Sequence, residues 1–478
     1  MFSVTQSRHA FSYCLRLGAF FLLAAGIGNL SQASQYPIEG YPDAQSFAPG
    51  DVINFHVSSE IERYHVTIER IGASNDRIWE RDLDNGTKRP IPAEASSQGC
   101  GWPVSFSLTV PADWKSGYYE VFFGASDPHN TRQWLEGRTT FFVIRAKNAG
   151  ATAKILLQLT TNTYNAYDNF GGHSLYAFNS AGGKPGSKVS FSRPITSVAG
   201  EWEIPFIRWA ERNGYDLEYA VNRDLEFRPE LLDHYRLVLS VGHDEYWSTP
   251  MRDNIEKFVA KGGNLAFFGG NSLTWQVRFE NDGREMVSWK ERYREDPLYD
   301  PDAPDPLVST LWRHPLVGSP ENQLVGAGMM FGGMHRSHGQ YMDGSGAFTV
   351  YRPEHWVFAR TGLRQGDQFG ATDHIVGYEC DGCEHSFVDG RPVPTTRDGT
   401  PESFEILALA PASWPADEWQ WYERRGGDRA GNACMGIHSV PGGGTVFTAS
   451  TTGWAHGLRG NDPIVETITR NVLNRLSR

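Results

Sequence analysis

Hydrophobic and polar residues alternate through the first third of the chain. Short alternating runs recur between residues 52 and 144, and turn signals such as Asp84-Asn85-Gly86 separate them. A period of two is typical of strands that bury one face, and closely spaced turns are typical of antiparallel sheets. We therefore predict an all-β domain over residues 36–147, built as an immunoglobulin-like sandwich.

From about residue 150 the pattern changes to short apolar runs separated by segments with helical periodicity. Strands are predicted at 155–159, 217–221, 237–241, 264–268 and 445–450, and helices at 205–213, 249–261 and 463–476. Strands that alternate with helices are typical of α/β domains. Residues 150–478 are thus predicted to form an α/β domain with a mostly parallel sheet.

One predicted turn from strand to helix carries several polar side chains. The strand at 237–241 leads through Gly242 into residues 243–246, and a helix is predicted to begin at Thr249. Open α/β sheets bind ligands at such a carboxyl edge, where strands end and helices begin. The helix dipole is expected to keep the carboxylate of Glu245 ionised, as a metal ligand or a base requires.

Other predicted strands end in polar residues as well. A predicted polar and aromatic loop at 160–172, with Tyr164 and Tyr167, follows one strand, Asn271 follows another, and Glu379 ends an apolar run. Each alone has an ordinary explanation: aromatic packing, a tight turn or a solvated acid. Together they place tyrosine, glutamate, histidine and asparagine at neighbouring strand ends, which predicts a ligand site there.

Several familiar chemistries lack their motifs. The α/β domain is predicted to be glutamine-amidotransferase-like, but Glu245 stands where such domains place a cysteine nucleophile, and no cysteine lies within 100 residues of it. The serine-hydrolase elbow and a phosphate-binding loop are also missing. The formal net charge of −12 argues against nucleic acids and anionic membranes as partners.

The first 33 residues are predicted to be an export signal. Arg8 and Arg16 precede an apolar run over 17–27, and small residues around Ala33 offer a cleavage point. The alternative is a retained N-terminal anchor. Cleavage would remove two arginines and no acids, so the net charge would move from −12 to −14. The mature protein is expected to be periplasmic or secreted, without a membrane partner.

Four cysteines remain after the predicted cleavage: Cys100, Cys380, Cys383 and Cys434. An even number in an exported chain is typical of disulfides, and four cysteines allow three pairings. Unpaired thiols are the other expectation. A zinc site that includes His385 ranks below both, because no second pair of cysteine or histidine ligands stands at the required spacing.

At these motifs the chain resembles the large (β) subunit of N,N-dimethylformamidase and the wider family that shares its C-terminal domain. The resemblance covers most of the mature chain. Its strongest parts are His243-x-Glu245-Tyr-Trp-Ser and Gly-Gly-Asn271, which follows Glu245 by 26 residues. It implies an amidase that acts on a small linear amide, together with a small subunit or as a homo-oligomer.

Family members that act on dimethylformamide hold one iron ion through two tyrosines and a glutamate. The resemblance implies that Glu245 is the carboxylate ligand in this chain. It implies one tyrosine from the 160–172 segment, Tyr164 or Tyr167, and Tyr119 of the sandwich domain as the other. Phenolate and carboxylate oxygens are hard donors that suit ferric iron, so one Fe³⁺ per chain is expected.

The resemblance also implies roles for three residues around the ion. Glu379 matches the acid/base position, where it could pass a proton to the leaving amine. His243 and Asn271 match residues beside iron and substrate, and Asn271 could stabilise an oxyanion.

The resulting hypothesis is an exported, metal-dependent hydrolase of a carbon–nitrogen amide bond. Two alternatives remain open. One is a non-catalytic carbohydrate- or peptide-binding protein, which the fifteen tryptophans would suit. The other is a hydrolase that uses zinc, with His243 as a ligand.

Overall fold

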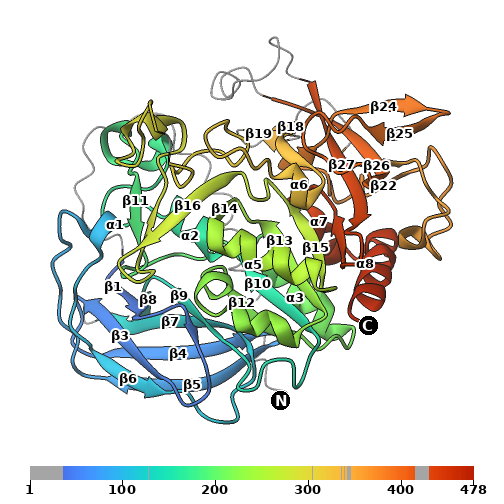
Figure 1. Ribbon diagram of the computed structural model, residues 1–478. Helices are drawn as coiled ribbons and strands as arrows, with labels where there is room; N and C mark the ends of the chain where they lie inside the picture. The colour runs from blue at the N-terminus through green and yellow to red at the C-terminus, as the bar shows by residue number, and fades with distance from the viewer. Residues whose placement is uncertain are drawn as a thin grey trace, which may run out of the picture.

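The N-terminal part of the chain is built almost entirely from strands. The computed structural model describes residues 36–478, except 128, 304, 335, 338–339, 342–345 and 415–429. The predicted export signal at residues 1–33 lies outside this range. Figure 1 shows the N-terminal strands in blue, below the larger, mixed part of the molecule.

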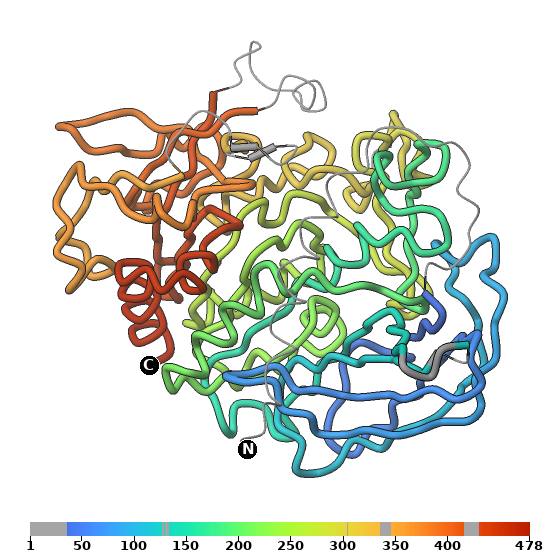
Figure 2. The backbone as a smooth tube through the Cα atoms, turned by 180° about the vertical axis from the view of Figure 1, so that it is seen from behind, coloured from blue at the N-terminus to red at the C-terminus, as the bar shows by residue number. Residues whose placement is uncertain are grey.

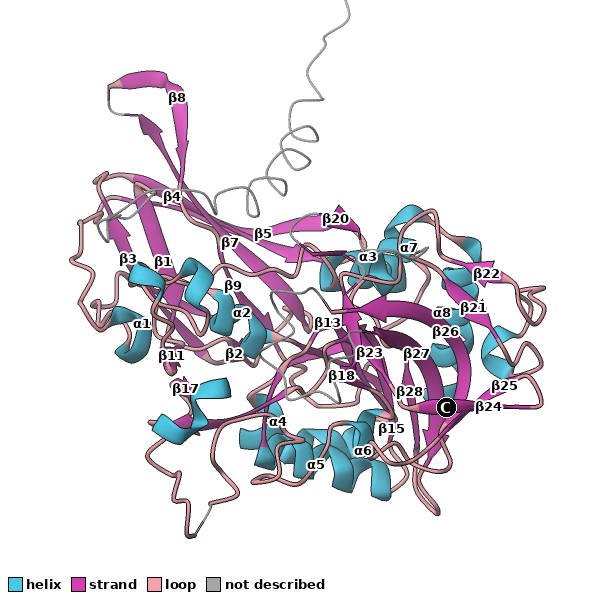
Figure 3. Cartoon of the chain, turned by 90° about the horizontal axis from the view of Figure 1, so that it is seen from above, coloured by secondary structure: helices cyan, strands magenta, loops and turns pink. Residues whose placement is uncertain are grey.

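Two sheets pack face to face in this N-terminal part. The smaller has the order β1 (Ile38–Pro42), β3 (Val52–Ser59), β6 (Phe106–Thr109). The larger has the order β2 (Ser46–Phe47), β9 (Thr140–Ile144), β7 (Gly117–Asp127), β4 (Tyr64–Ile71), β5 (Asn75–Leu83). The strand β8 (Asn130–Glu136) pairs with β7 outside this order. A single core that includes Phe55, Val66 and Phe142 lies between the two sheets. Figure 3 shows β8 and the end of β7 projecting from the sandwich.

A large mixed sheet forms the centre of the second part. Its parallel half contains β12 (Glu218–Val221), β10 (Ile155–Leu159), β13 (Leu237–His243), β15 (Asn264–Gly270) and β28 (Thr445–Thr448), in that order. Its antiparallel half continues with β27 (Ala430–Ser439), β26 (Glu405–Ser413), β18 (Gly328–Met334) and β23 (Glu379–Gly382). The short strands β21 (Phe348–Val350) and β22 (Gln368–Phe369) pair beside β26. The sheet is therefore mixed, whereas the sequence predicts a mostly parallel one.

The parallel strands bury both of their faces. Alternate residues point to opposite sides: Leu157 and Leu239 belong to one hydrophobic cluster, while Leu156 and Val238 belong to another. The helices α3 (Glu203–Arg212), α7 (Trp454–Gly460) and α8 (Pro463–Leu476) cover the first face, and α4 (Asp224–Phe227), α5 (Thr249–Ala260) and α6 (Asn322–Val325) cover the second. Burial on both faces explains why these strands are continuous apolar runs in the sequence.

The C-terminal helices lie on the side of the molecule away from the sandwich, as both side views show. Figure 2 shows this arrangement from behind, with the C-terminus in red. Asp462 caps α8, since its carboxylate accepts hydrogen bonds from the backbone N–H groups of Ile464 and Val465 at 2.8 and 3.1 Å. This cap and the helix it begins agree with the predicted helix at 463–476.

The turn after β13 differs from the prediction. A short strand, β14 (Tyr246–Ser248), intervenes before α5 and joins a small sheet with β16 (Trp275–Glu280), β17 (Glu285–Val287) and β11 (Lys188–Ser190). The cap of α5 is Ser248, whose hydroxyl accepts from the Met251 N–H at 3.3 Å, one residue before the predicted start at Thr249. Residue 245 thus lies outside the first turn of α5.

Glycine allows two close backbone approaches around this turn. A Cβ at Gly242 would lie 2.5 Å from the Trp202 side chain, and φ there is +83°. A Cβ at Gly270 would lie 2.6 Å from the carbonyl oxygen of Glu379. Only glycine lets the end of β15 meet β23 so closely. The sheet is therefore curled, so that its last strand, β23, contacts β15 in the middle of the sheet.

The remaining elements are short. They are α1 (Ala95–Gln98), α2 (Thr161–Tyr167), and the hairpins β19 (Arg336–Ser337) with β20 (Gln340–Tyr341) and β24 (His385–Val388) with β25 (Arg391–Pro394). The segment predicted as a loop at 160–172 therefore contains a helix, α2. No helix in the part of the chain that the structure describes is long and apolar enough to cross a bilayer.

The four cysteines after residue 33 are all buried free thiols, so the structure agrees with the expectation of unpaired thiols and contains no disulfide among them. The Sγ atoms of Cys383 and Cys434 lie 3.1 Å apart. The immunoglobulin-like and glutamine-amidotransferase-like assignments stay predictions.

Candidate active site

Three polar side chains meet at the carboxyl edge of the parallel strands. His243 ends β13, Asn271 follows β15, and Glu379 begins β23. His243 Nε2 lies 2.7 Å from Glu379 Oε2, and Asn271 Nδ2 donates a hydrogen bond to the same oxygen at 2.9 Å. All three side chains are buried. The close approach at Gly270 makes this meeting possible.

Glu245 is the centre of a second group of contacts beside the first. The hydroxyl of Tyr176 lies 2.8 and 2.9 Å from its two carboxylate oxygens, and the hydroxyl of Tyr167 lies 3.3 Å from Oε2. Trp275 Nε1 donates to Oε1 at 2.8 Å. His243 Nε2, at 3.3 Å from Oε2, links the two groups. Two phenols and one carboxylate thus converge in a site where Glu245 is only 3% exposed.

The structure brings together five of the seven predicted site residues: Tyr167, His243, Glu245, Asn271 and Glu379. The other two are engaged elsewhere. Tyr164 donates its hydroxyl hydrogen to Glu203. Tyr119 lies in the sandwich core, where its ring stacks on Phe142 and its hydroxyl donates to the Lys115 carbonyl at 2.5 Å.

Tyr176 takes the place beside Glu245 that the sequence analysis gave to Tyr119. It follows α2 by nine residues, and its hydroxyl also accepts a hydrogen bond from Tyr246 at 2.6 Å. The only sequence signal for Tyr176 is that it continues the aromatic segment of Tyr164 and Tyr167. Nothing in its immediate neighbours indicates that the chain folds back onto Glu245.

Lys290 is a second residue that the sequence analysis missed. Its Nζ lies 3.5 Å from the centre of the Tyr176 ring and 4.8 Å from that of Trp275. Within the described ranges Nζ forms no hydrogen bond or ion pair, and burial lowers the pKa of this amine. A cation over an aromatic face is attracted to it and stabilises negative charge on a phenol oxygen.

Burial and charge set the protonation of the site. Burial alone would lower the pKa of His243, but the carboxylates of Glu379 and Glu245 outweigh it and raise that pKa to about 9. His243 is therefore protonated at neutral pH and paired with Glu379. Burial and the Glu245 charge raise the pKa values of Tyr167 and Tyr176 well above the usual 10.

The expectation that a helix dipole keeps Glu245 ionised is wrong. The helix α5 begins four residues later, and the dipole effect is confined to the first turn. Burial instead raises the pKa of Glu245, in spite of the nearby His243 and Lys290 cations.

Asp381 and Thr274 fix the orientation of Asn271. Asp381 accepts hydrogen bonds from the backbone N–H groups of Asn271 and Ser272 at 2.9 and 3.1 Å. The Thr274 hydroxyl donates to Asn271 Oδ1, so the amide must present its NH₂ group to Glu379. Asn271 holds this position with φ of +52°.

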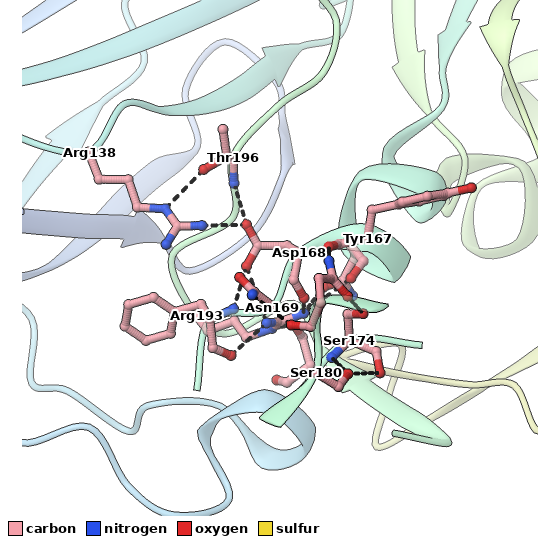
Figure 4. A network of polar contacts seen from close by, with 12 residues as sticks. Arg138, Tyr167, Asp168, Asn169, Ser174, Ser180, Arg193 and Thr196 are labelled. Carbon is pink, nitrogen blue, oxygen red and sulfur yellow. Dashed lines mark hydrogen bonds and ion pairs between the residues drawn. The ribbon is translucent and has the colours of Figure 1, made fainter. Parts of the chain in front are cut away.

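A buried ion-pair network fixes the segment that follows Tyr167 (Figure 4). Asp168 pairs with Arg138 at 2.5 Å and with Arg193 at 3.3 Å. Arg193 is fully buried, and its guanidinium also donates to the carbonyls of Asn165, Asp168, Phe170 and Ser190. The network ties the end of α2, and with it Tyr167, to the rest of the domain.

Replacing Arg193 by methionine is expected to lower the free energy of unfolding by about 3–5 kcal/mol, because it removes one of the two ion pairs of buried Asp168 and leaves several buried carbonyls without a donor. Urea denaturation measures the change. Arg212→Met is the control: Arg212 is exposed and donates to the Ala73 carbonyl, so its loss should cost about 0.5 kcal/mol or less. A similar loss for both variants would contradict the structural role of the network.

No group of three or more His, Cys, Asp and Glu side chains in the described ranges is arranged to hold a metal. The oxygens gathered at Glu245 come instead from one carboxylate and two phenols. Such a set suits hard cations.

Comparison with known proteins identifies the family. The sequence pattern of the family described as N,N-dimethylformamidase beta subunit-like, C-terminal, matches residues 65–467. The N,N-dimethylformamidase beta subunit of Alcaligenes sp. is 28% identical over 222 residues, and that of Paracoccus aminophilus is 27% identical over 224 residues. Each alignment covers 37% of this chain and 28% of the relative, so the chain spans just over a quarter of the curated relatives it matches.

A Paenibacillus chitinase, ChiW, is similar at 14% identity over 51% of this chain and 21% of that chain, with a TM-score of 0.16. The match over residues 65–467 covers most of the chain, and it is this match that decides the family. The chain belongs to the family of N,N-dimethylformamidase beta subunit-like C-terminal domain proteins.

Proposed function

We propose that this chain is a metal-dependent hydrolase that cleaves the carbon–nitrogen bond of a small amide, with a ferric ion held by Tyr167, Tyr176 and Glu245. The observation that supports the proposal is the convergence of both tyrosine hydroxyls on the buried Glu245 carboxylate, at 2.8–3.3 Å from its oxygens. The names of the relatives, which are dimethylformamidase subunits, support the reaction class.

The residues fit such an ion in spacing and in chemistry. Oxygen ligands that share one ion at about 2.0–2.2 Å are themselves separated by about 2.8–3.5 Å, depending on the coordination geometry. The Tyr176–Glu245 and Tyr167–Glu245 oxygens already have this spacing. A trivalent cation would also reverse the local field that keeps both phenols protonated, and phenolate is a hard donor.

A bound ferric ion would supply Lewis acidity to an amide carbonyl and to water. The residues of the chain supply the rest of the chemistry. Asn271 donates one N–H of its amide to Glu379, and the second N–H could be donated to an oxygen of the substrate; Asp381 and Thr274 hold the amide in that orientation. Glu379 and His243 share a proton over 2.7 Å, so this pair can accept a proton from water and pass one to the leaving nitrogen.

The closed surroundings restrict both water and substrate. His243, Glu245 and Glu379 are each at most 5% exposed. A cavity of about 40 Å³ is lined by Tyr176 and Lys290. The substrate class that we propose is small linear amides, which the names of the relatives support.

We also propose that the chain is exported and works with a second subunit. The apolar run near the N-terminus supports export, and the description of both relatives as beta subunits supports a partner.

Metal analysis of the purified protein tests the proposed function. We expect about one iron per chain and a broad visible absorption band from phenolate-to-iron charge transfer. Chelation should remove the band and the hydrolysis of N,N-dimethylformamide together, and ferric salt should restore both. Protein that takes up no iron from ferric salt, and that shows no band, would refute the proposed metal site.

A further inference from the structure

A second cavity, of about 340 Å³, lies far from the candidate active site. Its walls come from the end of α8, from β26, β27 and the start of β28, and from the turn at Trp356. Asn264, the first residue of β15, donates a hydrogen bond to the Leu476 carbonyl beside this cavity, whereas Asn271 follows the other end of β15. A seven-residue strand, on the order of 20 Å long, therefore separates the two sites.

The floor of this cavity contains a histidine without a partner. His438 is only 4% exposed, and neither of its ring nitrogens has a hydrogen bond within the described ranges. Burial lowers its pKa to about 4, so the ring is neutral at physiological pH. The Nδ1 atom is enclosed. Because an unpaired buried N–H is rarer than an unpaired acceptor, the ring proton belongs on Nε2, where it is available as a donor.

The rest of the lining combines apolar side chains with the hydroxyl groups of Ser403, Ser439 and Thr445, and the rim carries one charge of each sign. Ile437 and Leu476 are buried beside His438, and Trp356 forms a wall. The Arg475 guanidinium lies 4.9 Å over the Trp356 ring. Neither Arg475 nor Glu405 has an ion pair or a side-chain hydrogen bond within the residues that the structure describes. Both charges act on His355, which also lines the cavity: the Glu405 carboxylate raises the pKa of His355, and the Arg475 guanidinium lowers it.

We propose that this cavity binds a small zwitterion with an apolar side chain, namely a free α-amino acid of the size of leucine or phenylalanine. Its carboxylate would pair with Arg475, which stacking on Trp356 holds ready for a planar anion. Its ammonium group would face Glu405, and its side chain would cover Ile437 and Leu476. The His438 N–H adds a donor for an oxygen of the ligand.

The volume and the charges favour this class over others. A volume near 340 Å³ is at the small end of ligand pockets, which span about 300–1,000 Å³. A simple anion would satisfy Arg475 but would leave Glu405 facing negative charge. A simple cation would satisfy Glu405 but would leave Arg475 facing positive charge. A ligand that carries both charges on one carbon satisfies both residues.

Isothermal titration calorimetry on the full chain tests the proposal with L-phenylalanine and L-leucine as probes. Two analogues, 3-phenylpropanoate and 2-phenylethylamine, each keep the ring but only one charge. We expect saturable binding of an amino acid and at least about tenfold weaker binding of both analogues. No saturable binding of either amino acid up to about 10 mM would overturn the proposal. An analogue that binds as tightly as phenylalanine would also overturn it.

Matched variants locate the ligand. Arg475→Met and Glu405→Gln should each weaken amino-acid binding by about tenfold or more. Arg470→Met and Glu402→Gln are the controls, because Arg470 lies on the same helix over Trp209 and Glu402 is an exposed neighbour of Glu405, and neither lines the cavity. Controls that weaken binding as much as the test variants would place the ligand elsewhere and refute the assignment.

His438→Leu separates binding from stability. The substitution removes a buried polar group without a partner, so the melting temperature should stay the same or rise. Amino-acid binding should nevertheless weaken several-fold, because the Nε2–H donor is lost. Unchanged binding would remove His438 from the proposed site.

Discussion

Glu245→Gln is expected to abolish iron binding and, with it, amide hydrolysis. The Glu245 carboxylate is the group on which Tyr167, Tyr176 and Trp275 converge, and a neutral amide is a much poorer ligand for a hard cation. Outer residues around metal sites typically contribute about 10–100-fold in affinity or activity, so the loss of a direct ligand should exceed about a hundredfold. Iron per chain and kcat/KM for N,N-dimethylformamide measure the effect.

A pair of tyrosine variants provides the control. Tyr176→Phe should lose iron or shift the visible band, because its hydroxyl lies 2.8 Å from Glu245. Tyr119→Phe should keep both, since the Tyr119 hydroxyl is bound to a carbonyl in the sandwich core. The reverse result, with iron lost only in Tyr119→Phe, would contradict the ligand set proposed from the structure.

Glu379→Gln is expected to separate catalysis from metal binding. The variant should keep its iron, because Glu379 contacts His243 and Asn271 rather than the two tyrosine hydroxyls nearest Glu245. Its kcat should fall by about 10²–10⁴-fold, the usual contribution of a positioned acid or base. Steady-state kinetics and iron content of the same preparation measure both quantities.

Glu402→Gln is the matched control for this substitution, since Glu402 is exposed on the surface. It should keep both iron and activity. Full activity in Glu379→Gln would remove the residue from the mechanism, and lost iron would mean that it belongs to the metal site instead.

The sequence indicates the parallel strands and α8 well because local and tertiary signals agree there. Buried strands such as β10 and β13 are apolar on both faces, and Asp462 with Pro463 is a strong start for a helix. These elements in turn predict that His243, Asn271 and Glu379 could meet at one edge. The structure shows these three side chains in contact.

Other features depend on contacts that local sequence cannot reveal. The strand β14 forms because Tyr246–Ser248 pairs with Trp275–Val277. The local sequence alone does not reveal this pairing and instead predicts that the turn leads directly into the following helix. The antiparallel half of the sheet is joined by loops and hairpins, which carry no helical periodicity to signal their order. The chain after α2 must fold back to bring Tyr176 to Glu245, and no local pattern indicates this. The resemblance to the family therefore pointed to Tyr119 instead.

The curling of the sheet at Gly270 has a consequence for how the site is assembled. Tyr167, Tyr176 and Glu245 are within 78 positions of one another, on elements beside adjacent parallel strands. Glu379 lies 108 positions beyond Asn271 and reaches it because the antiparallel half closes onto β15. The oxygen cluster at Glu245 and the Glu379 carboxylate therefore come from different halves of the sheet. Substitutions in the antiparallel half are expected to alter the proposed proton transfer while the proposed ion-binding residues stay in place.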